Sequence, residues 1–165
     1  MEKWDAYLEN GQKTSITLTR GHGIPKGLFH LVAEVLVQHS DGDILFMQRS
    51  FSKGQYAGYF EATAGGSVLQ GETSEDAVIR ELAEETGIQS AKPRFLERKV
   101  LSDAASLIDR YYLQTTWDKK SIVLQTDETV NFIWLPLEDL DSFIAAHPIL
   151  PRQLETIRKV QRGEI

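Results

Sequence analysis

The segment from Gly66 to Ile88 constrains this chain more than any other, because it would place three glutamates on one helical face. Glu81, Glu84 and Glu85 are spaced i, i+3 and i+4, so a helix gathers their side chains within about one turn. Like charges at that spacing repel each other, and a surface helix gains nothing from collecting them. A divalent cation such as Mg²⁺ or Mn²⁺ resolves the conflict, since both ions prefer carboxylate oxygens and substrate phosphates.

The flanking residues indicate where this acidic helix begins and ends. The run from Thr73 to Asp76 is an N-terminal capping pattern, and Gly87 stands where a left-handed C-terminal cap would lie. We therefore expect a helix from about residue 74 to 86, preceded by a loop that contains Gly65 and Gly66. A glutamate-rich run alone is more often a solvated face than a metal site, so the prediction depends on the glycines and caps as well as the acids.

The whole segment resembles the Nudix box, G-x5-E-x7-R-E-U-x-E-E-x-G-U, in which U is an aliphatic residue. Seven positions of this pattern require one particular residue type, and all seven match by accident on the order of 10⁻⁸ times per starting position. The resemblance implies an α/β/α sandwich with a mixed β-sheet between helices. It also implies metal-dependent hydrolysis of a nucleoside diphosphate linked to another group. The matching residues are Gly66, Glu72, Arg80, Glu81, Leu82, Glu84, Glu85, Gly87 and Ile88.

The resemblance also implies roles for individual residues. In this family the metal is held by the box glutamates and by a backbone carbonyl just before the box, which here are Glu81, Glu84, Glu85 and Gly65. The metal, Mg²⁺ or Mn²⁺, lowers the pKa of a bound water and neutralises charge on the phosphoryl oxygens. Glu85 would be the most central ligand and Glu81 a ligand or the general base. Which glutamate takes the proton stays open.

Arg80 and Glu72 allow two interpretations. In the one that we favour, an ion pair between them fixes the loop against the helix and orients the neighbouring Glu81. Arg80 then belongs to the catalytic group together with Glu81 and Glu84. In the other interpretation Glu72 binds the metal directly.

Three residues outside the box are candidates for substrate binding. Arg49 and Lys53 follow an expected strand, four residues apart, where a loop could present both to a phosphate. The alternative is that they are two solvated cations. Glu128 resembles an acidic position that supplies a further ligand or base in several family members. Tyr111 and Tyr112 could stack on a base, but a strand points only one of them to a given face.

A weaker similarity links about residues 1 to 140 with the isopentenyl-diphosphate isomerase branch of the family. The isomerase cysteine falls on Gly65 and one of its metal-binding histidines falls on Ser67, and the chain contains no cysteine. Isomerase activity is therefore improbable, and we expect His30 to be a packed or hydrogen-bonded residue. The similarity rests on Trp4-Asp5, Arg20-Gly21, His30-Leu31-Val32, Arg49-Ser50 and Lys53 occurring in a similar order.

Three functional hypotheses therefore remain. The first is a metal-dependent hydrolase of a diphosphate, and the second is the isomerase. The third is a domain that senses a nucleotide without turning it over. Such a sensor is expected to lose box glutamates, and this chain keeps all of them.

Composition narrows the classes further. With 165 residues, of which 41% are hydrophobic, we expect one domain over residues 1–165 with a sizeable core. The absence of cysteine excludes disulfides, thiolate metal sites and thiol catalysis. A net charge of −6 argues against nucleic-acid binding, and no apolar run approaches the roughly 20 residues of a membrane helix. We expect a cytoplasmic enzyme that acts on a small-molecule diphosphate, and the family resemblance is compatible with a homodimer.

Hydrophobic alternation and turn residues predict the remaining elements. Because strands and helices are interleaved, they predict an α/β protein with a mixed sheet between helical layers. The expected strands are 4–8, 15–18, 29–38, 44–49, 60–63, 94–101, 107–116 and 130–135, and the expected further helices are 137–146 and 151–162.

Overall fold

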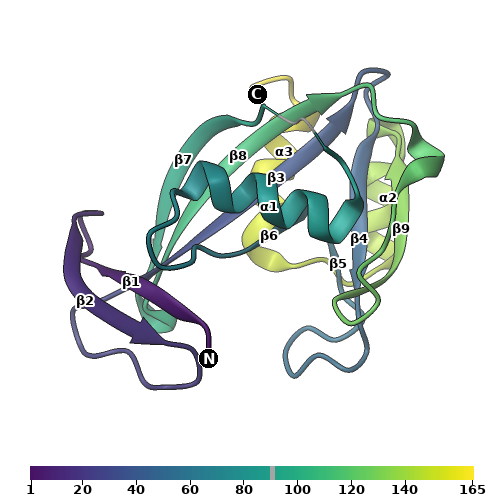
Figure 1. Ribbon diagram of the computed structural model, residues 1–165. Coiled ribbons are helices and arrows are strands. Elements are labelled where there is room, and N and C mark those ends of the chain that lie inside the picture. The colour runs from purple at the N-terminus through teal and green to yellow at the C-terminus, as the bar shows by residue number, and fades with distance from the viewer. Residues whose placement is uncertain (90–91) are drawn as a thin grey trace.

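The computed structural model describes residues 1–89 and 92–165. Figure 1 shows the arrangement of its strands and helices. The strands are β1 (Lys3–Tyr7), β2 (Lys13–Thr19), β3 (His30–His39), β4 (Ile44–Arg49), β5 (Phe60–Glu61), β6 (Thr63–Ser67), β7 (Arg94–Leu101), β8 (Ser106–Thr115) and β9 (Thr129–Leu135). The helices are α1 (Ser74–Thr86), α2 (Leu140–Ala146) and α3 (Leu154–Gln161), with short 3₁₀ turns at Ser102–Ala104, Lys119–Ser121, Leu137–Asp139 and Pro151–Gln153.

Strand β3 is the centre of the main sheet. It runs parallel to β8 along its whole length, and β7 pairs antiparallel with the far side of β8. On its other side β3 pairs antiparallel with β6, and near Gln38 it pairs with β4. Strand β4 also pairs antiparallel with β5 and β9. The sheet is therefore mixed, as the sequence predicted.

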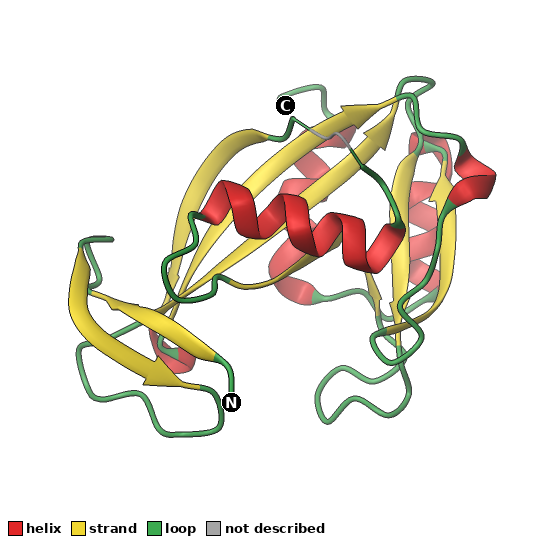
Figure 2. Ribbon diagram, viewed as in Figure 1, coloured by secondary structure: helices red, strands yellow, loops and turns green. Residues whose placement is uncertain are grey.

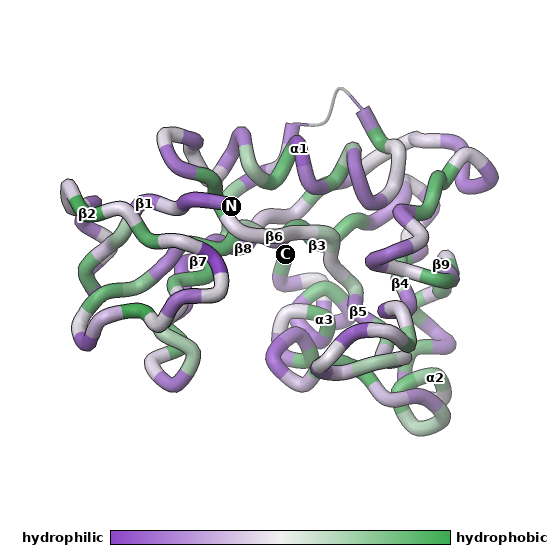
Figure 3. The backbone as a smooth tube through the Cα atoms, turned by 60° about the horizontal axis from the view of Figure 1, so that its bottom comes forward, coloured by the Kyte–Doolittle hydropathy of each residue, from purple (hydrophilic) through white to green (hydrophobic). Residues whose placement is uncertain are grey.

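Helices cover both faces of this sheet, so three layers are visible (Figure 3). Helix α1 lies on one face, where its Leu82 packs in the same core cluster as Val35 of β3. Helices α2 and α3 lie on the other face, where Phe143 and Ile157 share a cluster with Leu36 of β3. Adjacent residues of β3 serve opposite cores because successive side chains of a strand alternate between faces. The predicted α/β/α sandwich is confirmed.

Strands β1 and β2 form a separate two-stranded sheet that lies to one side of the sandwich (Figure 2). Its turn contains Gly11, whose φ of +85° lies in the left-handed region that favours glycine. Trp4 and Leu18 form a small core of their own with neighbouring apolar side chains. The hairpin therefore attaches to the sandwich rather than extending its sheet.

The ends of α1 match the sequence prediction. Thr73 caps the N-terminus, since its hydroxyl accepts a hydrogen bond from the backbone N–H of Asp76 at 3.1 Å. Gly87 caps the C-terminus with a φ of 77°. The last two predicted helices, 137–146 and 151–162, each begin with a 3₁₀ turn instead of a regular helical turn. None of the helices in the described ranges is long and apolar enough to cross a membrane.

The prediction that Gly65 and Gly66 lie in a loop was wrong. Both lie in strand β6, where Gly65 is opposite Glu34 of β3 and Gly66 is opposite Ala33. A Cβ atom at Gly65 would overlap the carbonyl oxygen of Ala33, and one at Gly66 would overlap the carboxylate of Glu81. These glycines are therefore needed for close approach between neighbouring segments and not for a turn.

Candidate active site

A cleft of about 410 Å³ lies where α1, β6 and the loops beside β4 and β9 meet. The fold brings together here residues that are up to 126 positions apart in the sequence, from Glu2 to Glu128. All the site residues predicted from the sequence line this cleft, namely Arg49, Lys53, Gly65, Arg80, Glu81, Glu84, Glu85 and Glu128.

Glu85 is the most deeply buried of the three box glutamates. The residue is 9% exposed, and its Oε2 accepts a hydrogen bond from the backbone N–H of Gly65 at 3.2 Å. Burial raises the pKa of the Glu85 carboxyl well above its ordinary value, and the nearby carboxylates of Glu61 and Glu81 raise it further. Keeping these neighbouring carboxylates ionised is unfavourable unless a cation compensates their negative charge.

Glu81 and Glu84 continue the acidic wall toward the solvent. The side chain of Glu81 is 16% exposed and that of Glu84 is 49% exposed. Arg80 Nη1 lies 2.7 Å from Glu81 Oε1 and 3.5 Å from Glu84 Oε2. Burial raises the pKa of Glu81, although the guanidinium of Arg80 opposes this shift. The three carboxylates therefore form a series from buried to exposed along one wall.

The predicted ion pair between Arg80 and Glu72 is present. Arg80 donates from Nε and Nη2 to the two carboxylate oxygens of Glu72, each at 2.9 Å. Glu72 also accepts a hydrogen bond from the backbone N–H of Leu69 at 3.0 Å. Because both of its oxygens are engaged and it does not line the cleft, Glu72 has a structural role that holds the loop against α1.

The two predicted cations outside the box are also paired. Arg49 Nη1 lies 3.1 Å from Glu61 Oε1, and Lys53 forms an ion pair with Glu128. The side chains of Arg49 and Lys53 are each 23% exposed, so they are not solvated loop cations. A hydrogen bond of 2.8 Å from the N–H of Ser50 to the carbonyl of Glu128 joins the segment after β4, which carries Lys53, to the loop before β9.

The donor chemistry of the cleft suits a hard divalent cation, although its carboxylates are not gathered around one point. Within residues 1–89 and 92–165, no three acidic or histidine side chains are placed together as metal ligands. The protein's own donors account for this, because Arg80 binds Glu81 and the N–H of Gly65 binds Glu85. Buried and half-buried carboxylates that otherwise repel each other are the ligand type that Mg²⁺ and Mn²⁺ prefer. The metal ligands therefore stay a prediction that the donor set supports.

Two charged residues that line the cleft were not identified as site residues from the sequence. Glu2 and Arg20 come from the ends of the β1–β2 hairpin, where Arg20 Nη1 lies 3.0 Å from Glu2 Oε2. The only usable signal was the antiparallel pairing itself, since Lys3 opposite Thr19 also brings residues 2 and 20 together. That pairing says nothing about where the hairpin lies relative to α1.

The histidine and the tyrosines that the sequence singled out lie outside the cleft. His30 stacks on Trp4 with ring centroids 4.7 Å apart, and its Nδ1 lies 3.2 Å from the carbonyl oxygen of Ala105, so the expected packed role is confirmed. The hydroxyl of Tyr111 lies 2.7 Å from that of Ser74, and Tyr112 donates to Gln38 at 2.6 Å. The two tyrosines serve opposite faces of the sheet and do not form a stacking surface.

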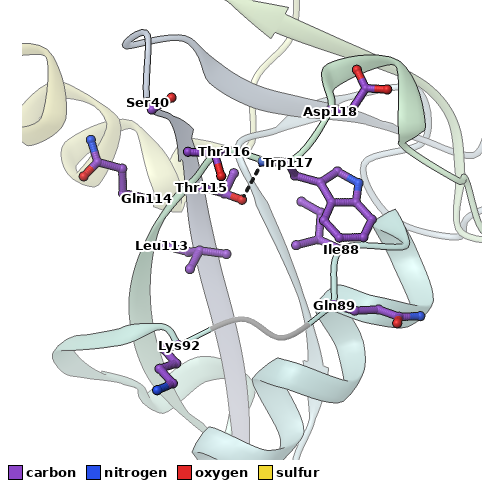
Figure 4. A pocket seen from close by; sticks show the side chains of 10 residues that line it. All are labelled: Ser40, Ile88, Gln89, Lys92, Leu113, Gln114, Thr115, Thr116, Trp117 and Asp118. Carbon is purple, nitrogen blue, oxygen red and sulfur yellow. Dashed lines mark hydrogen bonds between the residues drawn. The ribbon is translucent and has the colours of Figure 1, made fainter.

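A second hollow, of about 740 Å³, lies past the C-terminal end of α1 (Figure 4). Size alone favours it over the acidic cleft, but its chemistry does not. Asp118 is the only carboxylate among its described lining residues, and the hydrogen bond drawn in Figure 4, from the N–H of Trp117 to the Thr115 hydroxyl at 3.0 Å, is a local turn contact. The acidic cleft is therefore the candidate active site.

A family model described as NUDIX domain matches residues 28–160, which includes all of the acidic helix and most of the sandwich. The chain belongs to the Nudix family. The match includes Arg49, Lys53, Gly65 and every box residue, while the β1–β2 hairpin lies before it.

Individual relatives agree with this assignment. The uncharacterized Nudix hydrolase lin0387 of Listeria innocua is 28% identical over 151 residues, which cover 92% of this chain and 89% of that protein. The isopentenyl-diphosphate Delta-isomerase of Shigella flexneri is 25% identical over 154 residues, covering 83% and 85%. The crystal structure of DR0079 from Deinococcus radiodurans has a TM-score of 0.77 at 23% identity and covers 96% of this chain and 99% of that one. The family match and these relatives support a Nudix hydrolase, with a weaker likeness to the isomerase.

Proposed function

We propose that this Nudix protein hydrolyses a diphosphate bond, by attack of water on phosphorus, with Mg²⁺ or Mn²⁺ as cofactor. The substrate class is a nucleoside diphosphate linked to another moiety, or a related organic diphosphate. The observation that carries the proposal is the position of Glu85, buried among other carboxylates in a cleft that also presents Arg49 and Lys53. An acidic wall for a cation beside basic side chains for phosphate is what this reaction requires.

The residues of the chain divide into three groups by what they would do. Glu81, Glu84, Glu85 and the carbonyl of Gly65 would hold the divalent cation, which supplies Lewis acidity and lowers the pKa of a coordinated water. Arg49, Lys53 and Arg20 offer N–H donors to phosphoryl oxygens, with Glu128 pairing Lys53 at the far side of the cleft. Arg80, itself fixed by Glu72, keeps Glu81 in place so that Glu81 or Glu84 can accept the proton of the attacking water.

Isomerase activity is the alternative that the likeness to the isomerase raises, and two observations argue against it. The chain has no cysteine to take part in proton transfer. The position that would carry it, Gly65, is a strand residue at which any Cβ overlaps the backbone of β3. A nucleotide sensor without turnover is the second alternative, and the complete set of box glutamates argues against that one.

A substrate panel tests the proposal most directly. Nucleoside triphosphates, nucleotide sugars, dinucleotides and small organic diphosphates should be assayed with Mg²⁺ and with Mn²⁺, by release of phosphate or nucleotide. We expect at least one class to be hydrolysed only when metal is present, and a Glu84→Gln variant to lose that turnover while remaining folded. Equal rates for the variant and the wild type would remove Glu84 from the catalytic group.

The cytoplasmic location and the homodimer belong to the same proposal. The family resemblance supports both, and they can be tested apart from the chemistry. Fractionation of the source cells would test the first, and the mass of the protein in solution, measured by light scattering, would test the second.

A further inference from the structure

Glu61 is a buried carboxylate that neither the Nudix box nor the proposed metal ligands include. Its side chain is 12% exposed at the end of β5, and it is one of the like charges that face Glu85. Burying a second carboxylate beside Glu85 costs free energy, because two like charges are then held together away from water. Its ion pair within the described residues is with Arg49, at 3.1 Å.

The strand register fixes how Glu61 meets Arg49. Glu61 lies opposite Met47 on the antiparallel pair of β4 and β5, so Arg49, two residues after Met47, is its diagonal neighbour on the same face. Met47 belongs to the core cluster under α1, which shows that this is the face toward α1 and the cleft. The backbone of Arg49 is held as well, because its N–H donates to the carbonyl of Tyr59 at 2.9 Å.

The ion pair with Glu61 uses only one of the three nitrogens of the Arg49 guanidinium. Arg49 donates to Glu61 from Nη1, and within residues 1–89 and 92–165 no hydrogen bond is formed by Nε or Nη2. Nε is fully covered and still unpaired, which is costly for a donor of this kind. Nη2 is not covered in this way, and because Arg49 lines the cleft, Nη2 is the N–H group that a ligand entering the cleft can reach.

We propose that Glu61 is a positioning residue, which holds Arg49 by Nη1 so that Nη2 stays free to bind a phosphoryl group of the substrate. This inference rests on the proposed function, because it assigns the phosphate-binding geometry of the same cleft. The ligand is the diphosphate itself, bound by a charge-assisted hydrogen bond from Nη2 of Arg49.

The test measures binding without turnover. Methylenediphosphonate, a diphosphate analogue whose P–C–P bridge is not hydrolysed, is titrated calorimetrically into protein loaded with Mn²⁺, and Mn²⁺ alone is titrated separately. Glu61→Met fills a similar volume but accepts no hydrogen bond, so we expect it to weaken diphosphonate binding about tenfold, one lost charge-assisted contact. Mn²⁺ affinity should change by less than about twofold, and the loss in turnover should appear mainly in KM.

Three further variants and one matched control decide between positioning and other roles. Glu61→Gln keeps an oxygen that accepts from Nη1, so it should restore most of the affinity. Arg49→Lys keeps the charge but has a single nitrogen, which cannot pair with Glu61 and present a second N–H group in the fixed geometry of a guanidinium. It should therefore lose as much as Glu61→Met, and the double variant should lose no more than Arg49→Lys alone. Arg158→Lys is the matched control, because Arg158 pairs with Asp141 on the surface, away from the cleft, and should change neither affinity.

Two outcomes overturn the inference. If the losses of Glu61→Met and Arg49→Lys add in the double variant, Glu61 does not act through Arg49. If Mn²⁺ binding falls in Glu61→Met and Glu61→Gln alike, Glu61 is a metal ligand instead. Should Glu61→Met fail to fold, Glu61→Ser takes its place with the same expected results. Failure of the proposed function looks different, namely a wild-type protein that binds Mn²⁺ and diphosphonate but hydrolyses no member of the panel.

Discussion

Two buried glutamates, Glu34 and Glu85, lie on opposite sides of the strand pair formed by β3 and β6, and the charged groups around them are of opposite sign. Gly65 of β6 connects them, since it lies opposite Glu34 in the sheet and donates its N–H to Glu85. Glu34 is 2% exposed and accepts a hydrogen bond of 2.6 Å from Arg110, which is 3% exposed. Glu85 is 9% exposed and faces other carboxylates.

The surroundings of Arg110 complete the difference. Arg110 also donates to the hydroxyl of Thr156 at 3.0 Å and to the carbonyl of Arg152 at 2.6 Å, and Arg152 Nη2 lies 3.6 Å from Glu34. Glu34 is thus compensated from within the protein and ties β3 and β8 to α3. Among the described residues, Glu85 receives one backbone hydrogen bond and no ion pair with a basic side chain. A buried acid with its own arginine is a structural device, whereas one surrounded by acids is a candidate for binding an external cation, as we propose for Glu85.

The largest expected effect comes from neutralising Glu85. A Glu85→Gln variant should lose about a thousandfold or more in kcat, since the bound cation contributes several kcal/mol to the barrier. Without metal the same variant should be more stable than the wild type, because the repulsion inside the cleft is relieved. Turnover with Mn²⁺ and urea unfolding in EDTA measure the two effects. Unchanged rates would mean that metal-dependent turnover does not require the Glu85 carboxylate.

The opposite result is expected on the other side of β3. Arg110→Met leaves Glu34 buried without a partner and should cost about 3–5 kcal/mol of unfolding free energy. Adding Glu34→Gln should recover a large part of that loss, because it removes the uncompensated charge. Urea unfolding of the single and double variants checks this. If Arg110→Met cost less than about 1 kcal/mol, the contrast between the two glutamates would fail.

The pH dependence of stability sharpens the comparison. Burial and like charges raise the pKa of Glu85 above 4.5, so the folded protein binds more protons there than the unfolded chain. Stability contributed by this proton is therefore lost as pH rises from about 4.5 through the raised pKa of the folded state. In EDTA, wild type minus Glu85→Gln should give an unfolding free energy that falls with rising pH. Saturating Mn²⁺ should abolish this slope, and a flat difference in EDTA would contradict it.

The smallest effect is expected at an exposed pair. Asp141 is bound to Arg158, but its side chain is 74% exposed, so solvent screens the charge. Asp141→Asn should leave both the thermal midpoint and turnover unchanged within error. A measurable loss of stability or turnover would mean that an ion pair makes an acidic side chain important in this molecule even when that side chain is exposed.

The sequence predicted the parts of the molecule that local patterns determine. The caps at Thr73 and Gly87, the mixed sheet and the α/β/α layers follow from spacing, turn residues and the family resemblance. The placement of Gly65 could not be predicted, because a glycine pair carries the same signal in a turn as in a strand that packs closely against its neighbours.

Long-range contacts account for the rest of the difference. Arg20 and Glu61 are single charges in ordinary strand-like surroundings, and their sequence neighbours carry no sign of a cleft. Glu61 becomes informative only when β5 lies beside β4, which sets it next to Arg49 and near Glu85. Charge and burial can be assigned to such residues only after the chain is folded.

The attachment of the β1–β2 hairpin has a consequence for how relatives of this chain can diverge. The hairpin precedes residues 28–160, yet Asp5 accepts a hydrogen bond from the N–H of Gly71 at 2.9 Å, and Glu2 and Arg20 form one rim of the cleft. Exchanging this hairpin for another would alter the charge on that rim of the cleft while leaving Glu81, Glu84 and Glu85 of α1 in place. Substrate selectivity and catalytic rate can therefore change independently among relatives of this chain.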